Sequence, residues 1–449
     1  MHGLVPGPLG WTTQGLVDHL RELMWEMRGD RKGVAVVRAR LAVSDLPLAL
    51  PPGQISLVFR SPQGLMRQSL GVAAAAPQTQ VRLQATADGH LVPDPQAIET
   101  LSHWLASQQV PTWAAVIGES LQADADGAHY GLHVWLPRIW LEQRAQGGVD
   151  AVVLLQRTAD PEAFLAEVAT ALRGLQPTPQ DAVARPTPPE LVGADPEWLR
   201  QLRSAIEWVQ DDTRKLVLAR RAQLHAEPPL QWPELVLQMA RNRPNAWIAA
   251  AAGVFEDDFC CATPELLVTV DVQGARSMAM AGTAAQDAPV DAKLAWEHDA
   301  VVQWVQAAMV RGGAQPVVHA RKWVQAGPLR HLSTPIESPP PADALPLAIH
   351  LHPTPALLGI PRRDAMAQVL ALESRHRQWY GGFAGILAAD GSGFGEVAVL
   401  LRGMATGADC AYAWAGAGLV HGSDPDGEDA EISNKLASIL QSVIGEPSP

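Results

Sequence analysis

The sequence predicts a mixed α+β fold built on large, mostly antiparallel sheets flanked by helices. Short runs of apolar or alternating residues recur along the chain, as expected for β-strands. Segments with apolar residues at helical spacing lie among them, but the two types do not alternate as regularly as the βαβ units of a parallel sheet require. Hydrophobic residues make up 47% of the 449 residues and charged residues 18%, which allows a sizeable buried core.

The expected elements can be placed in chain order. Strands are expected at 55–59, 151–155, 215–220, 247–255, 266–270, 384–389, 396–402 and 411–415. Helices are expected at 161–175, 196–210, 233–241, 292–310, 362–372 and 429–444. The glycine-rich stretch 391–395 lacks the spacing of a phosphate-binding loop and precedes an expected strand, so a hairpin turn is predicted there.

Two proline clusters suggest how the chain is organised. Repeated proline at 176–189 breaks regular structure and predicts a linker. It separates an N-terminal part, 1–190, which completes the fold, from a C-terminal catalytic part, 191–449. The second cluster, 335–346, is expected to be a loop inside the C-terminal part. No residue pattern in the N-terminal part suggests catalysis.

Charge and hydropathy exclude several classes of function. The formal net charge of −13 argues against a nucleic-acid partner, which favours a basic face. No uncharged apolar run is long enough for a membrane span, and no basic segment followed by an apolar core marks a signal peptide, so a cytoplasmic protein is expected. Cys260, Cys261 and Cys410 are expected to be reduced thiols, since no C-x-x-C pair is present.

Several charged residues are candidates for a site, and each also has a simpler explanation. Glu428 and Glu431 lie three apart at the start of an expected helix, and Glu297 lies in another, so the two helices could hold a hard cation such as Mg²⁺. Acidic helix starts also stabilise the helix dipole. Lys215 leads an apolar strand, where it is either a desolvated base or a salt-bridged lysine. Glu265 is a candidate general acid if burial raises its pKa.

Glycines and histidines add weaker indications. Close backbone approach to an anionic ligand is possible at three glycine clusters, which include Gly282, Gly416 and Gly418. His350 and His352 are expected in a loop or at a strand end, with capping or core hydrogen bonding as their role. His331 precedes an apparent loop and is ambiguous on its own.

Taken in order, the stretches of the C-terminal part resemble the chorismate-binding enzyme family. That family includes isochorismate synthases, salicylate synthases and the large subunits of anthranilate and aminodeoxychorismate synthases. The resemblance covers the whole C-terminal part, and no segment of the N-terminal part contributes to it. The matching segments are KLVLAR (215–220), CCATPELL (260–267), AMAGTA (279–284), WEHDAVV (296–302), HLSTPI (331–336), LHPTPALLGIPR (351–362), RQWYGGFAGIL (377–387), GEVAVLLR (395–402) and AGAGLVHGSDPDGEDAEISNKL (415–436).

This resemblance implies the chorismate-utilising enzyme fold, chorismate as substrate and Mg²⁺ as cofactor. It assigns the metal to Glu297 and Glu431, with Glu428 as a further contributor, and implies that the metal holds the ring carboxylate of chorismate. Arg402 and Tyr380 match residues that bind the enolpyruvyl carboxylate. The remaining substrate-binding residues implied by the match are Gly282, Thr283, His331, Gly416, Gly418 and Lys435.

Two positions discriminate among members of the family. Lys215 matches the lysine that activates water in isochorismate and salicylate synthases. Ala281 lies where aminodeoxychorismate synthases place a nucleophilic lysine, and alanine cannot form that adduct. The resemblance therefore implies an isochorismate synthase: Lys215, neutral when it acts, takes a proton from water attacking ring C2, and protonated Glu265 donates to the departing C4 hydroxyl.

Other functions remain open at this point. A salicylate synthase would carry the reaction on by eliminating pyruvate, an anthranilate synthase component would use ammonia, and a degenerate member would bind a chorismate-like anion without turnover. The pathway, menaquinone or siderophore synthesis, is not determined. A monomer without an obligate protein partner is expected.

The sequence also departs from the family pattern. Leu294 stands where the family often has a further glutamate, which predicts a thinner metal shell or a larger role for water. The run after Thr283 lacks the arginine that is common in the family.

Overall fold

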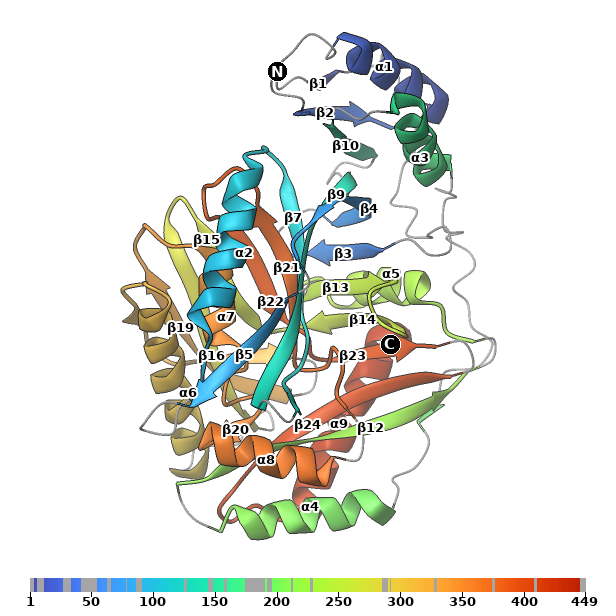
Figure 1. Cartoon of the computed structure of the whole chain (residues 1–449). Helices are drawn as coiled ribbons and strands as arrows, with labels where there is room; N and C mark the ends of the chain where they lie inside the picture. The colour runs from blue at the N-terminus through green and yellow to red at the C-terminus, as the bar shows by residue number, and fades with distance from the viewer. Residues whose placement is uncertain are drawn as a thin grey trace.

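The computed structural model describes residues 4–5, 12–26, 34–41, 55–62, 66–77, 79–85, 91–124, 127–143, 148–156, 160–173, 190–191, 196–210, 213–226, 229–284, 290, 292–326, 329–373, 376–407 and 410–444. Within them, strands and helices combine into the mixed α+β architecture that the sequence predicts (Figure 1). The predicted linker 176–189 lies outside the described residues, and the boundary at residue 190 stays a prediction.

The helices carry buried apolar faces at the spacing the sequence indicated. Among those expected, only the terminal residues differ by a few positions, as helix ends commonly do. The helices are α1 (Thr13–Glu26), α2 (Pro95–Gln108), α3 (Pro161–Arg173), α4 (Pro196–Trp208), α5 (Trp232–Asn242), α6 (Ala292–Arg311), α7 (Ala344–Leu351), α8 (Arg362–Leu372) and α9 (Pro425–Ile444).

The strands form ladders that are antiparallel in every described pairing except that of β1 with β2. This confirms the predicted sheet type. The strands are β1 (Leu4–Val5), β2 (Val34–Arg40), β3 (Ser56–Arg60), β4 (Arg67–Ala75), β5 (Thr79–Ala85), β6 (Leu91–Pro93), β7 (Trp113–Gly118), β8 (Gln122–Asp124), β9 (Gly127–Gln143), β10 (Val149–Gln156), β11 (Glu190–Leu191), β12 (Lys215–His225), β13 (Trp247–Ala252), β14 (Asp258–Thr263), β15 (Leu266–Asp271), β16 (Gly274–Ala284), β17 (Val317–Val318), β18 (Lys322–Ala326), β19 (Leu329–Ser338), β20 (Gly359–Ile360), β21 (Phe383–Ala388), β22 (Gly395–Val399), β23 (Gly403–Thr406) and β24 (Ala411–Val420).

Strands from the N-terminal part are hydrogen-bonded directly to strands from the C-terminal part. β3 pairs with β13, and β7 pairs with β21 over six residue pairs. One branch of the ladder then runs through β14, β23 and β24 to β12, and the other runs through β22, β15 and β16 to β19. Figure 1 shows β7 beside β21 and β22 at the centre of the molecule. The two branches lead to opposite sides of the site, with β12 and β24 on one and β16 and β19 on the other.

Helices α6 and α9 cover the ends of these two branches. α6 packs mainly against β16, while α9 packs against β24. The core face of α9 is formed by buried Ile432, Leu436, Ile439 and Val443, spaced three or four residues apart. Since this face is directed at the sheet, the first turns of the helix can present other side chains to a cavity.

Local expectations about two histidines, His331 and His350, were wrong. His331 lies within β19, although it was placed before a loop, because this strand continues through Pro335 to residue 338. His350 lies in α7 instead of a loop, whereas His352 follows the helix as its C-cap and its Nε2 lies 3.0 Å from the carbonyl of Glu119, which confirms the predicted capping or core hydrogen bonding. The second proline cluster is accordingly divided among β19, a short connection and the first turn of α7, where proline is tolerated. The 391–395 turn joins β21 to β22 as predicted.

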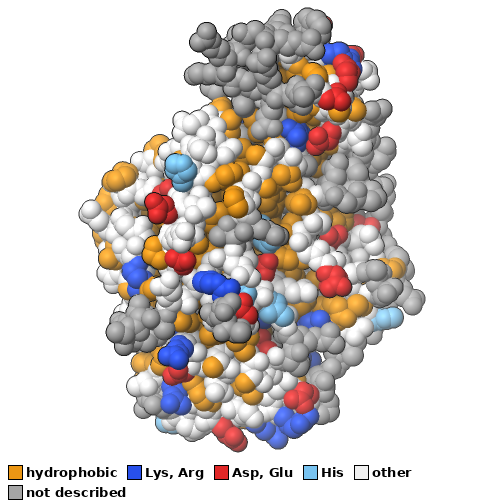
Figure 2. All heavy atoms as spheres, viewed as in Figure 1, with side chains coloured by type: hydrophobic (Ala, Val, Ile, Leu, Met, Phe, Trp, Pro, Cys, Tyr) orange, Lys and Arg blue, Asp and Glu red, His pale blue; other side chains and the backbone are white. Residues whose placement is uncertain are grey.

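Acidic and basic side chains are interspersed over the face of the molecule in Figure 2. This face carries no broad basic surface of the kind that binds nucleic acid. Among the described residues, no helix is both long enough and apolar enough to cross a membrane.

Candidate active site

One cavity of about 300 Å³ brings together the residues singled out by the sequence. This volume lies at the lower end of the range for small-molecule sites. The candidates lining it are Lys215, Glu265, Gly282, Glu297, His331, Tyr380, Arg402, Gly416, Gly418, Glu428, Glu431 and Lys435. The backbone of Thr283 pairs with His331 beside the cavity, but its side chain is outside the described ones. No described residue of the N-terminal part lines the cavity.

The first wall is the ladder between β12 and β24. Lys215, only 1% exposed, begins β12, and its Nζ lies 2.9 Å from Oε1 of Glu297 on α6. Gly418 of β24 pairs with Val217 and lies beneath this ion pair. A Cβ at Gly418 would approach Oε1 of Glu297 to 2.6 Å and Cε of Lys215 to 2.9 Å. Glycine at this position therefore leaves room for the pair.

Gly418→Ala should displace the ends of the Lys215 and Glu297 side chains with little cost to folding, because both ends are flexible. We expect the turnover of the protein's substrate to fall at least roughly tenfold, since small misplacements of catalytic groups are costly. Steady-state kinetics and the melting temperature should be measured together, with Gly427→Ala as control; a Cβ there meets no atom closer than 3.3 Å. Unchanged kinetics in a folded Gly418→Ala protein would contradict the assigned role.

One face of α9 forms the second wall. Glu428, Glu431 and Lys435 follow at intervals of three and four residues, so they lie along one side of the helix. Nζ of Lys435 donates to Oε1 of Glu431 at 2.6 Å and to the carbonyl of Gly416 at 2.7 Å. The helix start is fixed by Asp424, whose carboxylate accepts from the amide of Gly427 at 2.8 Å. The cap therefore sets where the acidic residues face the cavity.

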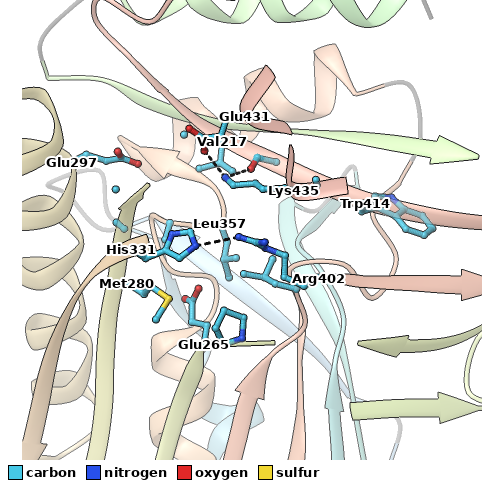
Figure 3. Close-up of a pocket in the computed structure, with 18 of the residues that line it drawn as sticks. Val217, Glu265, Met280, Glu297, His331, Leu357, Arg402, Trp414, Glu431 and Lys435 are labelled. Atoms are coloured by element: carbon cyan, nitrogen blue, oxygen red, sulfur yellow. Dashed lines mark hydrogen bonds and ion pairs between the residues drawn. The ribbon is translucent and has the colours of Figure 1, made fainter. Parts of the chain in front are cut away.

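Glu265 reaches the cavity from the turn between β14 and β15. The residue is 5% exposed, and burial raises the pKa of its carboxyl group to about 8, against the opposing effects of Lys215 and Arg402. Its backbone amide donates to Oγ1 of Thr263, which fixes the turn. Figure 3 shows Glu265 facing His331 and Arg402, with Glu297 and Glu431 on the other side of the cavity. A buried carboxyl that is protonated near neutral pH is suited to donate a proton.

His331 and Arg402 form a joined pair across the middle of the cavity (Figure 3). Nη2 of Arg402 donates to Nε2 of His331 over 3.2 Å. Burial, with Arg402 and Lys435 nearby, holds the pKa of His331 well below its usual value, so the ring is neutral and can accept this bond. Arg402 has φ of 55°, in the left-handed region that non-glycine residues rarely adopt. The backbone strain of about 1–3 kcal/mol directs a guanidinium into the cavity.

A bulge at Gly282 shapes the third wall. The register of β16 against β19 shifts between Ala281 and Thr283, and Gly282 has φ of +80°. A Cβ at Gly282 would lie 2.7 Å from Cδ1 of Leu294 on α6. Leu294, which stands where the family often has a glutamate, therefore fills the space over the bulge with an apolar side chain.

The buried His298 ties α6 to this wall. Its Nδ1 lies 3.1 Å from the carbonyl of Ala281, and its Nε2 lies 2.7 Å from Oγ1 of Thr334. Since a carbonyl only accepts, Nδ1 carries the proton and Nε2 accepts from the threonine hydroxyl. These bonds hold the adjacent Glu297 at a fixed place on the cavity wall.

Sequence reasoning identified the polar core of the cavity but missed several of its walls. Tyr380, whose hydroxyl lies near Gly416, was expected; burial raises its pKa to about 12, so it stays a hydroxyl donor. The missed lining residues include Met280, Leu357, Arg377 and Trp414. Arg377 stands at the start of a matching segment, which was the available signal.

The carboxylates suit a hard divalent cation in type. Glu297, Glu428 and Glu431 supply oxygen donors to one cavity, and Mg²⁺ typically takes one or two protein carboxylates and completes its shell with water and substrate. Within the described residues, no group of three or more His, Cys, Asp or Glu is close enough to hold a metal ion. Two of the carboxylates instead contact lysines: Glu297 contacts Lys215, and Glu431 contacts Lys435.

Comparisons with known proteins agree with this arrangement. The family model described as "Chorismate binding enzyme" matches residues 119–444. Isochorismate synthase MenF of Bacillus subtilis is 28% identical over 271 residues, which is 56% of each chain. The vibriobactin-specific isochorismate synthase of Vibrio cholerae is 31% identical over 244 residues, 50% of this chain and 61% of that protein. The matches thus span less than two thirds of either relative.

The fold itself extends further than these sequence matches. The structure of MenF, the menaquinone-specific isochorismate synthase from Escherichia coli, aligns with a TM-score of 0.72. The alignment covers 95% of this chain and 98% of that chain at 21% identity. At this identity the match shows a shared fold, and it confirms the predicted fold class.

Proposed function

The chain belongs to the chorismate-binding enzyme family, and we propose that it converts chorismate to isochorismate. The observation that carries the proposal is that Lys215 and Glu265 both line one cavity and enter it from different walls. Lys215 is buried beside Glu297, while Glu265 has its pKa raised to about 8. A base and a protonated acid placed around one ligand are what the exchange of a hydroxyl between ring carbons requires.

The cations of the cavity are suited to hold the two carboxylates of chorismate. Arg402 presents a guanidinium fork that matches a carboxylate. His331 accepts a hydrogen bond from Nη2 of Arg402 and so fixes the orientation of the guanidinium. The Tyr380 hydroxyl can donate to the same carboxylate. Gly416 and Gly418 carry no side chain over this region, where a Cβ at Gly416 would lie 3.1 Å from the hydroxyl of Tyr380. We assign the enolpyruvyl carboxylate to this end.

The proposed reaction exchanges hydroxyl groups on the ring. Lys215 takes a proton from water as the water oxygen bonds to C2. The two conjugated double bonds of the ring each shift by one position, from C1=C2 to C1=C6 and from C5=C6 to C4=C5. The C4–O bond breaks, and Glu265 donates its proton so that the C4 hydroxyl leaves as water. Ala281, 7% exposed on the cavity wall, offers no amine that could attack the ring. Water is therefore the proposed nucleophile.

Mg²⁺ is the proposed cofactor, with Glu297 and Glu431 as ligands and Glu428 as a contributor. When bound, it would neutralise the ring carboxylate and fix the orientation of the substrate. The charges of the protein support this proposal. Because Lys215 and Lys435 are already paired with Glu297 and Glu431, a substrate with two carboxylates adds negative charge that a divalent cation would offset.

The purified protein should consume chorismate and form isochorismate when Mg²⁺ is present, and stop when EDTA removes the metal. We expect activity to return on addition of excess Mg²⁺, since oxygen ligands bind this ion reversibly. Products should be identified by chromatography with mass detection. Chorismate consumption that persists in EDTA would contradict the metal assignment while leaving the reaction in place.

The same assay separates the alternatives. Salicylate and pyruvate would identify a salicylate synthase, and anthranilate formed with ammonia would identify an anthranilate synthase component. A protein that binds chorismate without consuming it would be a non-catalytic homologue. The relatives named for menaquinone and for vibriobactin support either pathway, so deletion of the gene and scoring of both products would decide between them.

A further inference from the structure

The middle of the edge of β12 opposite β24 is completed by side chains instead of a strand, while β11 pairs with its last residues, Leu224 and His225. Only the first residues of β12 pair with β20 on this edge: Lys215 with Ile360, and Leu216 with Gly359. The amide of Val217 then donates to the carbonyl of Leu358. Beyond this point the backbone groups of β12 that face away from β24 need other partners, because buried amides and carbonyls are rarely left unpaired.

A buried ion pair supplies those partners. Nη2 of Arg377 donates to the carbonyl of Val217 at 2.7 Å, and Oε1 of Glu373 accepts from the amide of Ala219 at 2.8 Å. The two side chains are joined twice, through Nε to Oε2 at 2.7 Å and Nη2 to Oε1 at 2.5 Å. The Glu373 and Arg377 side chains are 8% and 10% exposed. They replace the missing strand along the segment that follows Lys215.

The same guanidinium holds the opposite side of the cavity wall. Nη1 of Arg377 donates to the carbonyl of Leu357 at 2.7 Å, and the amide of Tyr380 donates to the carbonyl of Arg377 at 2.9 Å. Leu357, Arg377 and Tyr380 line the main cavity and also a smaller one of about 20 Å³ behind it. Arg377 therefore stands between the two cavities and connects β12, the 357 segment and the turn that carries Tyr380.

We propose that Glu373 and Arg377 are positioning residues that fix the strand carrying Lys215 relative to Tyr380. This inference rests on the proposed function, because it concerns the placement of the proposed base against the substrate. The geometry of the pair suits this task. The guanidinium of Arg377 is a planar fork that donates hydrogen bonds in fixed directions, so it can set the distances between three segments. A single point charge cannot do this. Neither residue is assigned a contact with the reacting atoms.

The proposal can be tested by removing the fork and returning it as a free ion. Arg377→Ala should lower kcat/KM for chorismate roughly 100-fold, the order of loss expected when a catalytic group moves by about 1 Å. Because Arg377 lies between the two cavities, its removal leaves a space open to the catalytic cavity. Guanidinium chloride at tens of millimolar should then restore kcat at least tenfold, while equal concentrations of sodium chloride or urea should not.

Matched variants make the outcome decisive. Arg200→Ala removes an arginine that is paired with Glu197 on the exposed side of α4, and its kinetics should remain those of the wild type with no response to guanidinium. Arg377→Lys keeps the charge without the fork and should retain a reduced kcat. Rates must be divided by the folded fraction, measured by circular dichroism, so that loss of folded protein does not count as lost catalysis.

Two results would overturn the inference: wild-type kcat/KM in folded Arg377→Ala, or a loss that guanidinium does not reverse in a folded protein. Wild-type protein that consumes no chorismate would instead remove the proposed function. Failure of the inference and failure of the proposed function are therefore distinguishable, because an inactive wild-type protein is seen before any variant is made. If Arg377→Ala does not fold, Glu373→Gln is measured in its place. It should lower kcat while leaving Arg377 in place, and wild-type kcat in the folded Glu373→Gln protein would overturn the inference.

Discussion

Glu265→Gln should lose roughly 100-fold or more in turnover while becoming more stable than the wild type at neutral and alkaline pH. The loss follows because an amide cannot donate the proton that the departing C4 hydroxyl needs. The gain follows from burial of the carboxyl group. A glutamate whose pKa is about 8 in the folded protein and 4.5 in the reference state must take up a proton on folding at neutral pH. Glutamine avoids this cost.

The pH dependence of both effects has a definite sign. Below about pH 4.5 the carboxyl is protonated in both states and contributes no difference. Between about 4.5 and 8 the unfolded state is ionised while the folded state is not, so wild-type stability falls by up to about 1.4 kcal/mol per pH unit relative to Glu265→Gln. At pH 8 the variant should be more stable by on the order of 4 kcal/mol. Urea unfolding at pH 5 and pH 8 measures this difference.

Activity should decline over the same upper range. Because kcat/KM reports the ionisation of the free enzyme, wild-type kcat/KM should fall above about pH 8 as Glu265 loses its proton. The residual kcat/KM of Glu265→Gln should lack this decline. Glu396→Gln is the matched control: burial also raises the pKa of this carboxyl, which accepts from Nε1 of Trp247 and does not line the cavity. Its activity should be that of the wild type, and a large loss there would undermine the interpretation.

The sequence was sufficient where chemistry depends on residues that keep their order along the chain. Lys215, Glu265 and Glu431 come from segments far apart, yet the matching motifs predicted that they would meet, and the fold brings them to one cavity. Strands were predicted at 215–220 and 266–270 because these runs alternate or stay apolar, and in the structure β12 continues to His225 and β15 to Asp271. Periodicity and family motifs therefore identified the polar core and two of the strands that carry it.

The rest depends on tertiary contacts that local patterns do not encode. Glu373 and Arg377, four residues apart after a helix, have the spacing of an ordinary surface ion pair, but they are buried because β12 lacks a neighbouring strand there. His331 was missed as a strand residue because a proline follows four positions later. The left-handed backbone of Arg402 had no sequence signal, since it is not a glycine.

At helix α7, by contrast, the sequence held a signal that the prediction overlooked. Its first three residues were assigned to the proline-rich loop 335–346, although Asp343 caps the helix by accepting from the amide of Leu345 at 3.1 Å. An aspartate before an apolar run is a typical helix start, and Pro346 lies within the first turn, where the missing amide costs nothing. The prediction relied on the proline content of the segment and ignored the cap at Asp343. In the structure, burial of the apolar residues of α7 stabilises the helix despite Pro346.

Lys215→Arg should abolish turnover while keeping the ion pair with Glu297. Guanidinium stays protonated under all working conditions, so it preserves the positive charge but cannot accept a proton from water. The Lys215→Ala variant should also lose roughly 100-fold or more, yet it removes charge and base together, and it leaves the carboxylate of Glu297 without the contact at 2.9 Å. The arginine variant therefore separates proton transfer from electrostatics.

The kcat values of Lys215→Arg and Lys215→Ala distinguish two roles of Lys215, that of a base and that of a positive charge only. If Lys215 is the base, kcat should fall to a similar level in both variants, and only Lys215→Ala should show weakened stability, because a buried partner is lost there. If the lysine serves only as a positive charge beside Glu297, Lys215→Arg should retain most of the turnover. A Lys215→Arg enzyme that forms isochorismate at a rate near that of the wild type would reassign proton abstraction to another group of the cavity.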